Sequence, residues 1–298
     1  LFFRLYRIDP SVFFDISGLP LKRIVWRNIF YSYRPQIFWA RDFYNSDHII
    51  RHLELKRIGA KQWGVCHSFL SFGDVLSELR YLSFDKYYTM GPTASLYYSD
   101  IWPQQMDVVN ANPFRIKETH LMKRHEEKSD AILIMASFGI VDEDFILSIK
   151  KIIQFFNNKK IYLQIKFDQS LLLEKDKFLE TVCSGANNIE VVDNEPQIGK
   201  NIYDLVSRCK YVVSDLSSMA IEPIVLGACA IALDVVPGIE KSNLRSVPGL
   251  CVDNAEDAIR RISMIDNGKL KYPFEKYANH INIDGVSFNE AVIKDACK

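Results

Sequence analysis

A buried strand, a polar turn and a helix are predicted by the segment Tyr211-Val-Val-Ser-Asp-Leu-Ser-Ser-Met-Ala-Ile-Glu-Pro-Ile-Val-Leu-Gly227. The strand covers Tyr211 to Val213, serines and an aspartate crowd the turn, and Gly227 is a typical residue for the end of a helix. The beginning of a helix presents unpaired backbone N–H groups and the positive end of the helix dipole. Serine hydroxyls add further hydrogen-bond donors, so the segment predicts a site that suits a phosphate.

Glu222 follows Ser218 by four residues, which places both side chains on one face of a helix, about one turn apart. A carboxylate there can accept hydrogen bonds from a ribose diol, whereas Ser217 and Ser218 suit the phosphate. We interpret the pattern as a nucleotide site across the beginning of the helix. The alternative is that Asp215 or Ser217 only caps the helix.

The composition is that of an ordinary soluble globular protein, with 298 residues, 48% of them apolar and 25% charged. The 37 Lys and Arg residues balance the 37 Asp and Glu residues, which argues against a nucleic-acid partner bound through bulk positive charge. No apolar run reaches the length of about 18 residues that indicates a membrane span. The six cysteines have no short spacings, which favours buried free thiols in a reducing cytoplasm over a zinc site or a disulfide framework.

Strand-like and helix-like runs alternate along the chain, which is the signature of parallel α/β layers. Strands are expected at 36–40, 61–66, 85–90, 107–110, 131–136, 160–167, 189–193, 211–213, 229–235 and 250–252. Helices are expected at 46–58, 92–98, 142–157, 171–183, 202–209 and 255–265, and again after residue 287. The polar run 115–128, in which we expect His120 and His125 to be exposed, is interpreted as a domain boundary. We therefore predict Rossmann-like domains at 1–120 and 121–298, the first of them incomplete because its first strands are missing.

The first 60 residues differ from the rest, with ten Lys and Arg residues against five Asp and Glu residues. Within them, Lys22-Arg-Ile-Val-Trp-Arg-Asn-Ile-Phe-Tyr-Ser-Tyr-Arg34 mixes bases with large aromatic side chains. A helix of this kind can lie on an anionic membrane surface. The alternative is a helix that packs on its own domain and keeps its bases in solvent.

The run 201–227 resembles the donor-binding region of bacterial GT-B glycosyltransferases, especially those that make capsule, O-antigen and teichoic-acid-type polymers. In that family two serines and a glutamate in the next helix hold the donor diphosphate and ribose, and Ser217, Ser218 and Glu222 match this pattern. Gly64-Val-Cys-His-Ser68 and the later strand that ends in Gly91-Pro92 are similar to a Gly-x-x-His-Gly loop and a Gly-Pro of the family. The resemblance spans residues 41–265.

Two positions depart from the family pattern. Relatives carry His-Pro after the second strand of the donor domain, where this chain has Gln164-Ile-Lys-Phe-Asp-Gln169, so Lys166 becomes the candidate for the positive charge. A solvated lysine at a strand end is the alternative for Lys166. Ser68 also replaces the glycine after His67.

The resemblance implies two Rossmann-like domains that face a cleft. The implied activity is transfer of a sugar or polyol-phosphate group from a nucleotide-activated donor to a glycan or lipid-linked acceptor of the cell surface, at the cytoplasmic face of the membrane. No metal or cofactor is expected, since GT-B enzymes use helix ends and basic side chains for the leaving diphosphate. The donor-side candidates are Ser214, Ser217, Ser218, Glu222, Lys166 and Gly139.

On the acceptor side, His67 follows a strand and has a pKa suited to removing a proton near neutral pH. Asp42 would orient His67 or bind acceptor hydroxyls. The alternatives are a histidine that binds a loop carbonyl and an aspartate that caps a helix or forms a salt bridge. Gly139 would let the backbone approach the donor, or would simply form a turn.

Two other functions share these features. A UDP-N-acetylglucosamine 2-epimerase has the same fold and the same serine and glutamate contacts with the nucleotide. Its further acidic, Arg and His residues in a fuller first domain are not found in this sequence. A non-catalytic module that binds a nucleotide-sugar is the third hypothesis, because the His-Pro motif is missing.

Overall fold

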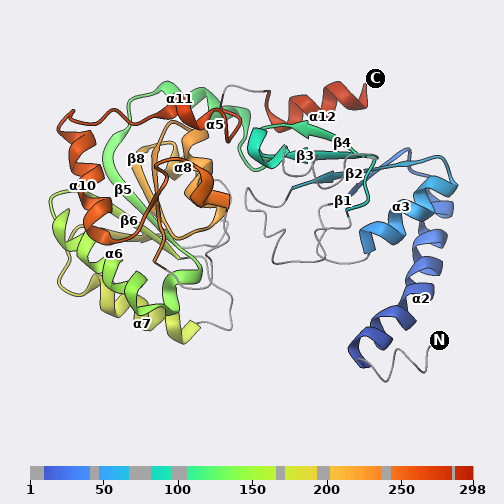
Figure 1. Cartoon of the computed structure of the whole chain (residues 1–298), viewed down its shortest axis with the longest axis horizontal. Helices are drawn as coiled ribbons and strands as arrows, with labels where there is room; N and C mark the ends of the chain where they lie inside the picture. Colours follow the sequence, from blue (N-terminus) through green and yellow to red (C-terminus); the bar gives the residue numbers. More distant parts are fainter. Residues whose placement is uncertain are drawn as a thin grey trace. The chain divides into compact units, whose positions relative to one another are not determined.

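The computed structural model describes residues 10–40, 47–66, 82–95, 106–165, 172–192, 202–235, 243–283 and 286–297 (Figure 1). These residues form two compact units. The first holds the described residues up to Val109 except 90–94, and the second holds 90–94 and the described residues from Asn110 onward. The chain thus passes into the second unit before the predicted boundary at 120/121.

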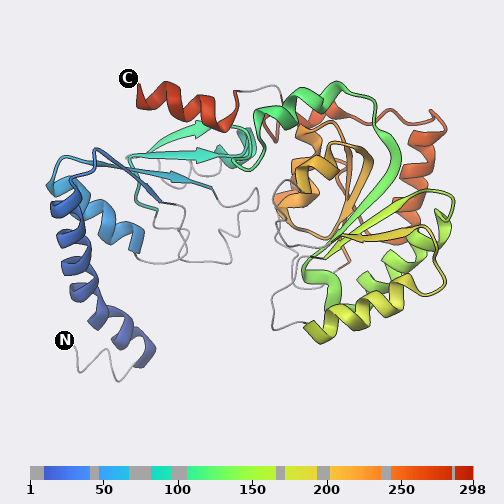
Figure 2. The ribbon, with the colours of Figure 1, turned by 180° about the vertical axis from the view of Figure 1, so that it is seen from behind.

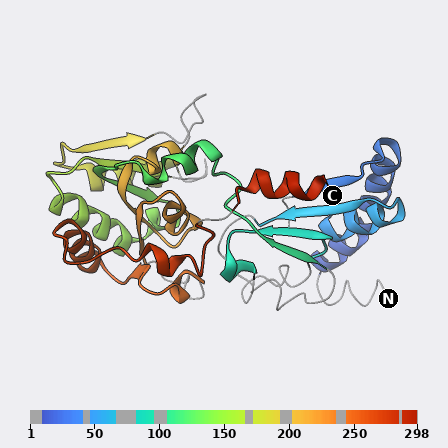
Figure 3. The same cartoon turned by 90° about the horizontal axis from the view of Figure 1, so that it is seen from above.

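The first unit has a four-stranded sheet in the order β1-β2-β3-β4, in which β1 pairs with β2, and β2 with β3, in parallel. Two helices lie side by side next to it (Figures 1 and 3). The bounds are α2 (Pro10–Tyr33), β1 (Ile37–Ala40), α3 (Asp47–Arg57), β2 (Lys61–Val65), β3 (Lys86–Thr89) and β4 (Asp107–Asn110). These elements confirm the strands and the helix that the sequence predicts here.

The second unit has a six-stranded parallel sheet in the order β10-β9-β8-β5-β6-β7. The strands are β5 (Ser129–Ala136), β6 (Ile161–Ile165), β7 (Ile189–Val192), β8 (Cys209–Ser214), β9 (Cys229–Leu233) and β10 (Cys251–Val252). The main helices are α6 (Glu143–Phe155), α7 (Leu172–Cys183), α8 (Ile202–Val206), α10 (Ala255–Asp266), α11 (Phe274–Tyr277) and α12 (Phe288–Ala296). Contacts of α6 with both α7 and α10 place these three helices together (Figures 1 and 2).

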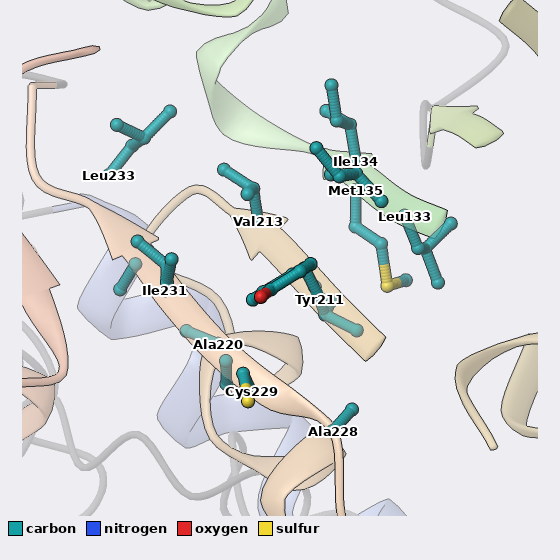
Figure 4. Close-up of a cluster of buried hydrophobic side chains, with 14 of the residues drawn as sticks. Leu133, Ile134, Met135, Tyr211, Val213, Ala220, Ala228, Cys229, Ile231 and Leu233 are labelled. Atoms are coloured by element: carbon teal, nitrogen blue, oxygen red, sulfur yellow. The ribbon is translucent and has the colours of Figure 1, made fainter. Parts of the chain in front are cut away.

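The centre of this sheet is buried on both faces, as expected of a parallel sheet covered by helices. Residues 131–136 of β5 form an unbroken run of buried apolar side chains. Figure 4 shows Leu133 and Met135 of β5 beside Tyr211 and Val213 of β8 in this core. Burial also raises the pKa of the Cys209 and Cys229 thiols to about 12, so these thiols stay protonated and unreactive near neutral pH.

The polar run 115–128 is part of the second unit and not an exposed linker. It forms α5 (Glu118–Met122) and a 3-10 turn, η2 (Lys123–His125). Ile116 joins the core, and Arg124 donates a hydrogen bond to the carbonyl of Ile283 at 2.9 Å. The prediction of an exposed His120 is wrong, because only 2% of this residue is exposed. Its polarity suggested solvent, but the residue finds polar partners inside the fold.

Candidate functional site

The chain after β8 does not form one continuous helix. Ser217 donates its backbone N–H to the carbonyl of Asp215 at 2.7 Å, and a 3-10 turn, η5, covers Ser218–Ala220. The α-helical turn α9 begins only at Glu222 and ends at Val225. Pro223 favours this late start because its missing N–H is tolerated only in a first helical turn. The prediction of a helix that begins at the serines and contains Glu222 is therefore wrong, and the predicted phosphate site loses its helix dipole.

Asp215 joins this turn to the loop that follows β5. Its Oδ2 atom accepts hydrogen bonds from the backbone N–H groups of Ser137 at 2.8 Å and Gly139 at 3.1 Å. The Ser137 hydroxyl donates to the same carboxylate at 2.9 Å. Asp215 is fully buried, so it ties together the carboxyl ends of two neighbouring strands.

Two donor-side candidates, Ser214 and Gly139, have structural roles within the fold. The Ser214 hydroxyl donates to the carbonyl of Asp215 at 2.9 Å, and Ser214 is fully buried, so its predicted contact with a donor stays a prediction. A side chain at Gly139 would place its Cβ 2.4 Å from the ring of the buried Phe145. The structure thus supplies a packing reason for glycine at position 139. Its predicted contact with a donor stays a prediction.

Glu222 is buried beside Tyr203 of α8. Only 3% of the residue is exposed, and its Oε2 atom accepts a hydrogen bond of 2.5 Å from the hydroxyl of Tyr203 on α8. Burial and the negative charge of Glu222 raise the pKa of Tyr203 well above 10, whereas Arg115 lowers it in part. Tyr203 therefore remains a hydrogen-bond donor and holds the carboxylate in one orientation.

Sequence reasoning missed Tyr203 and Arg115. Tyr203 lies within the run 201–227 that resembles a donor region, which was the available signal. No local periodicity links Tyr203 to Glu222, because the two residues are 19 positions apart. Tyr203 comes before β8 in the sequence and Glu222 comes after it.

His120 lies next to this pair. Its ring centroid is 6.0 Å from that of Tyr203, its Nε2 atom is 3.4 Å from Oδ1 of Asp204, and its Nδ1 atom accepts the N–H of Lys117 at 3.1 Å. The N–H bond to Nδ1 assigns the proton of the neutral ring to Nε2. Burial lowers the pKa of His120, and the charge of Asp204 opposes this only in part.

This lowered pKa predicts a loss of stability in acid. Between the ordinary pKa of 6.5 and the lower folded pKa, the unfolded chain binds a proton that folded His120 does not, so the free energy of unfolding falls as the pH falls. The slope from one such group approaches about 1.4 kcal/mol per pH unit.

Urea unfolding of the second unit between pH 7.5 and pH 5 tests this expectation. His120→Gln should flatten the dependence, whereas His125→Gln, the matched control, should leave it unchanged. Equal slopes in the wild type and in His120→Gln would contradict the assignment. Burial also lowers the pKa of His280. The free energy of unfolding of every variant therefore keeps part of its pH dependence.

The structure describes the remaining candidates from the sequence only in part. Ser217 is half-buried, and the backbone of Ser218 lies in η5. Lys166, His67 and Asp42 lie outside the described residues, so their roles stay predictions. Within the described ranges, no group of three His, Cys, Asp or Glu side chains has the arrangement of a metal site.

A surface cavity of about 470 Å³ lies elsewhere, beside β10 and α10. Its lining includes Asp253, Asp257 and Arg261 but none of the candidate residues. Arg261 donates to the carbonyls of Gly249 and Leu250. Asp257 pairs with Arg260 at 2.7 Å, so two of these charged side chains have partners within the fold, and we do not assign the cavity to a ligand.

Comparison with known proteins gives a fold but no family. No protein family model and no curated sequence matches the chain. The S. aureus MnaA–UDP complex has a TM-score of 0.59 and 12% identity, over 95% of this chain and 81% of the other. The Neisseria meningitidis UDP-GlcNAc 2-epimerase bound to UDP-GlcNAc has a TM-score of 0.59 and 14% identity, over 94% and 80%. A glycosyltransferase from Rickettsia africae has a TM-score of 0.55 and 15% identity, over 93% and 79%.

At these identities the likeness establishes the fold. The chain has an α/β fold with two Rossmann-like units, each built on a sheet with parallel pairing, as in GT-B-type enzymes. This confirms the fold class that the sequence predicts. The structural neighbours include both an epimerase and a glycosyltransferase, so the class of neighbours is that of nucleotide-sugar enzymes.

Proposed function

We propose that the protein transfers a sugar or polyol-phosphate group from a nucleotide-activated donor to a glycan or lipid-linked acceptor of the cell surface, at the cytoplasmic face of the membrane. The observation that carries the proposal is the Glu222 carboxylate, oriented by Tyr203 and placed directly after the Ser217–Ser218 turn. This turn follows the carboxyl end of β8, and ligands of parallel α/β sheets bind beyond that end of the strands.

In this proposal the donor side has three parts. Glu222 accepts hydrogen bonds from the ribose hydroxyls, because a carboxylate offers several acceptor positions. Ser217 and Ser218 donate to the diphosphate through their hydroxyl groups. Lys166 offsets the negative charge that develops on the leaving group. No metal or cofactor is part of the proposal.

On the acceptor side, His67 takes the proton of the attacking hydroxyl and Asp42 orients His67. The hydroxyl oxygen forms a bond to the anomeric carbon while the bond from that carbon to the donor phosphate oxygen breaks. The nucleotide leaves with that electron pair. For a polyol-phosphate donor the same exchange takes place at phosphorus.

An epimerase is the second candidate. It is kept because the fold is also similar to that of the Neisseria meningitidis UDP-GlcNAc 2-epimerase, with a TM-score of 0.59. The same residues, Glu222 and the two serines, would hold the nucleotide. The difference lies in the reaction, because an epimerase changes the donor without any acceptor.

Nucleotide binding is tested by thermal shift with UDP, CMP, CDP, GDP and their sugar conjugates. A ligand at 100 times its Kd stabilises the folded state by about 2.7 kcal/mol, so one nucleotide should raise the melting temperature of the wild type. Glu222→Gln should lose most of that increase, since it gives up the charged acceptor for the ribose. The comparison uses the ligand-induced increase, because the variant also weakens the bond to Tyr203.

Glu256→Gln is the matched control, because Glu256 is exposed at the beginning of α10 and should respond to the nucleotide like the wild type. An unchanged response in Glu222→Gln would remove Glu222 from the site. No response of the wild type to any nucleotide would refute the donor site as a whole.

Product analysis then separates the two candidates. Release of the nucleotide that requires an added acceptor supports the transferase. Change of UDP-N-acetylglucosamine to its 2-epimer without an acceptor supports the epimerase. Binding without either reaction indicates a nucleotide-sugar-binding module and contradicts both enzymes.

A further inference from the structure

A serine, a histidine and an aspartate meet in the first unit, where α3 packs beside β2 (Figure 1). The hydroxyl of Ser83 lies 2.6 Å from Nδ1 of His52 on α3, which is a short hydrogen bond. Nε2 of the same ring lies 3.1 Å from Oδ2 of Asp85. A hydroxyl, an imidazole and a carboxylate in this order are the groups of a serine nucleophile with its general base.

The ring of His52 has the tautomer that a general base needs. The Asp85 carboxylate only accepts, so we assign the proton of the neutral ring to Nε2, and Nδ1 then accepts the Ser83 hydroxyl. In the Ser-His-Asp triads of hydrolases the two ring nitrogens have exchanged places, but each group has the same role. Burial lowers the pKa of His52 and Asp85 opposes this in part, so the ring is neutral near pH 7 and can take a proton.

The contact between His52 and Asp85 is close but is not aligned as a full hydrogen bond. Catalytic hydrogen bonds are often poorly aligned in a free enzyme and tighten only when the substrate binds. The distance of 3.1 Å already lets the carboxylate stabilise the imidazolium that forms when the ring takes a proton.

Gln62 of β2 fixes the segment that carries Ser83 and Asp85. Its side-chain amide donates to the carbonyl of Ser83 at 2.7 Å and to that of His48 at 2.9 Å. Its backbone N–H donates to Oδ2 of Asp85 at 2.7 Å, and the Asp85 N–H donates to the Gln62 carbonyl at 2.8 Å. Gln62 is fully buried, so a strand and a helix position the three groups, which is the support that a reactive site requires.

The serine is within reach of a ligand, whereas the base behind it is buried. Ser83 is half-buried, and only 4% of His52 is exposed. The backbone N–H of Phe84 comes directly after the serine, and in other serine nucleophile turns this N–H stabilises the developing oxyanion. No residue that the structure describes accepts the Phe84 N–H. The Phe84 ring stacks on His48 of α3 at 5.5 Å, which holds this backbone in place.

We propose that Ser83 is the nucleophile of a second active site, which hydrolyses esters of short acyl groups. The Ser83 oxygen forms a bond to the carbonyl carbon while its proton passes to Nδ1 of His52. The bond from that carbon to the alcohol oxygen then breaks, and the alcohol leaves with the proton from His52. Water attacks the acyl-serine in the same way, which releases the carboxylic acid and restores Ser83. The acyl group is short because the hydroxyl is half-buried.

Covalent labelling of the full chain with a fluorophosphonate probe tests the proposal, because these probes react with serines that a neighbouring base activates. We expect one probe per chain, which peptide mass spectrometry should locate on Ser83. Hydrolysis of p-nitrophenyl acetate should begin with a burst of about one nitrophenolate per chain, since a burst is the kinetic sign of an acyl-enzyme intermediate.

Variants assign the role of each group. Ser83→Ala should abolish both the label and the burst. His52→Gln should slow labelling by about a hundredfold or more, which is the usual contribution of a general base. Asp85→Asn should slow it as well, because an amide no longer favours the tautomer with its proton on Nε2. Ser263→Ala is the matched control, since Ser263 is a half-buried serine of α10, and it should be labelled like the wild type.

An unlabelled Ser83 in the wild type would overturn the proposal, and this result does not depend on whether any variant folds. An unchanged labelling rate in His52→Gln would overturn it too, because the base would then take no part. In both cases the three residues only tie their segment to α3. The site uses no residue of the proposed donor site, so the nucleotide thermal shift of Ser83→Ala should equal that of the wild type. The two proposals can therefore fail separately.

Discussion

Replacing Asp215 with alanine is expected to lower the free energy of unfolding of the second unit by about 4 kcal/mol. The change leaves the backbone N–H groups of Ser137 and Gly139 without their acceptor in a place that the fold buries. Each such unpaired group costs about 1–3 kcal/mol, and the Ser137 hydroxyl loses its partner as well. The effect is large because one side chain serves several donors at once.

Urea unfolding, followed by circular dichroism, measures this loss. Asp215→Asn should fall between the wild type and Asp215→Ala, because its one carbonyl oxygen still accepts while its NH₂ group faces other donors. Asp144→Ala on the exposed first turn of α6 is the matched control and should cost less than about 1 kcal/mol. If Asp215→Ala unfolds at the same urea concentration as this control, the carboxylate does not hold the two loops together.

Replacing Gly91 with alanine is expected to cost about 3 kcal/mol, the second-largest effect. Gly91 has a φ of +127°, a region that residues with a side chain rarely adopt. A Cβ atom there would lie 2.4 Å from the carbonyl oxygen of His280 and 2.6 Å from the Cα of Ile281. Both atoms belong to the backbone, so neither can rotate away. The hydroxyl of Thr93, which lies 2.9 Å from the His280 ring, would lose its position as well.

Gly268→Ala is the control for the glycine conformation alone. Gly268 has a φ of +65° with no atom within 4 Å of an added Cβ, so its replacement should cost only about 1 kcal/mol. Hydrogen exchange of residues 90–94 and 277–283 locates the damage, which should appear in both segments of Gly91→Ala. Equal costs for the two variants would show that 90–94 does not pack against 280–282 in solution.

Most of the secondary structure of the described residues follows from local patterns. The apolar run 131–136 predicts a strand buried on both faces, and β5 is such a strand. The helix expected at 142–157 is α6, and Asp142 caps its start by accepting the N–H of Phe145 at 2.9 Å. These predictions succeed because burial and capping depend on residues only a few positions apart.

The candidate site was predictable only in part. Its spacing after the serines makes Glu222 a candidate, and the structure buries it beside Tyr203, but its contact with a nucleotide stays a prediction. The helix expected to begin at Ser217 and Ser218 is wrong, because Pro223 fits only a first helical turn and α9 begins at Glu222. Tyr203 was missed, since no spacing rule joins it to Glu222.

Local patterns specify that the chain is a series of alternating strands and helices with parallel sheets, because each element's pattern of apolar residues encodes which of its faces must be buried. Which remote residues meet depends on how the elements pack together. Asp215 binds Ser137, 78 positions earlier, because β8 lies next to β5 in the sheet. Likewise, His120 is buried because α5 packs beside α8. Strand order and helix placement result from how all the elements fill one core, and no local pattern specifies that outcome.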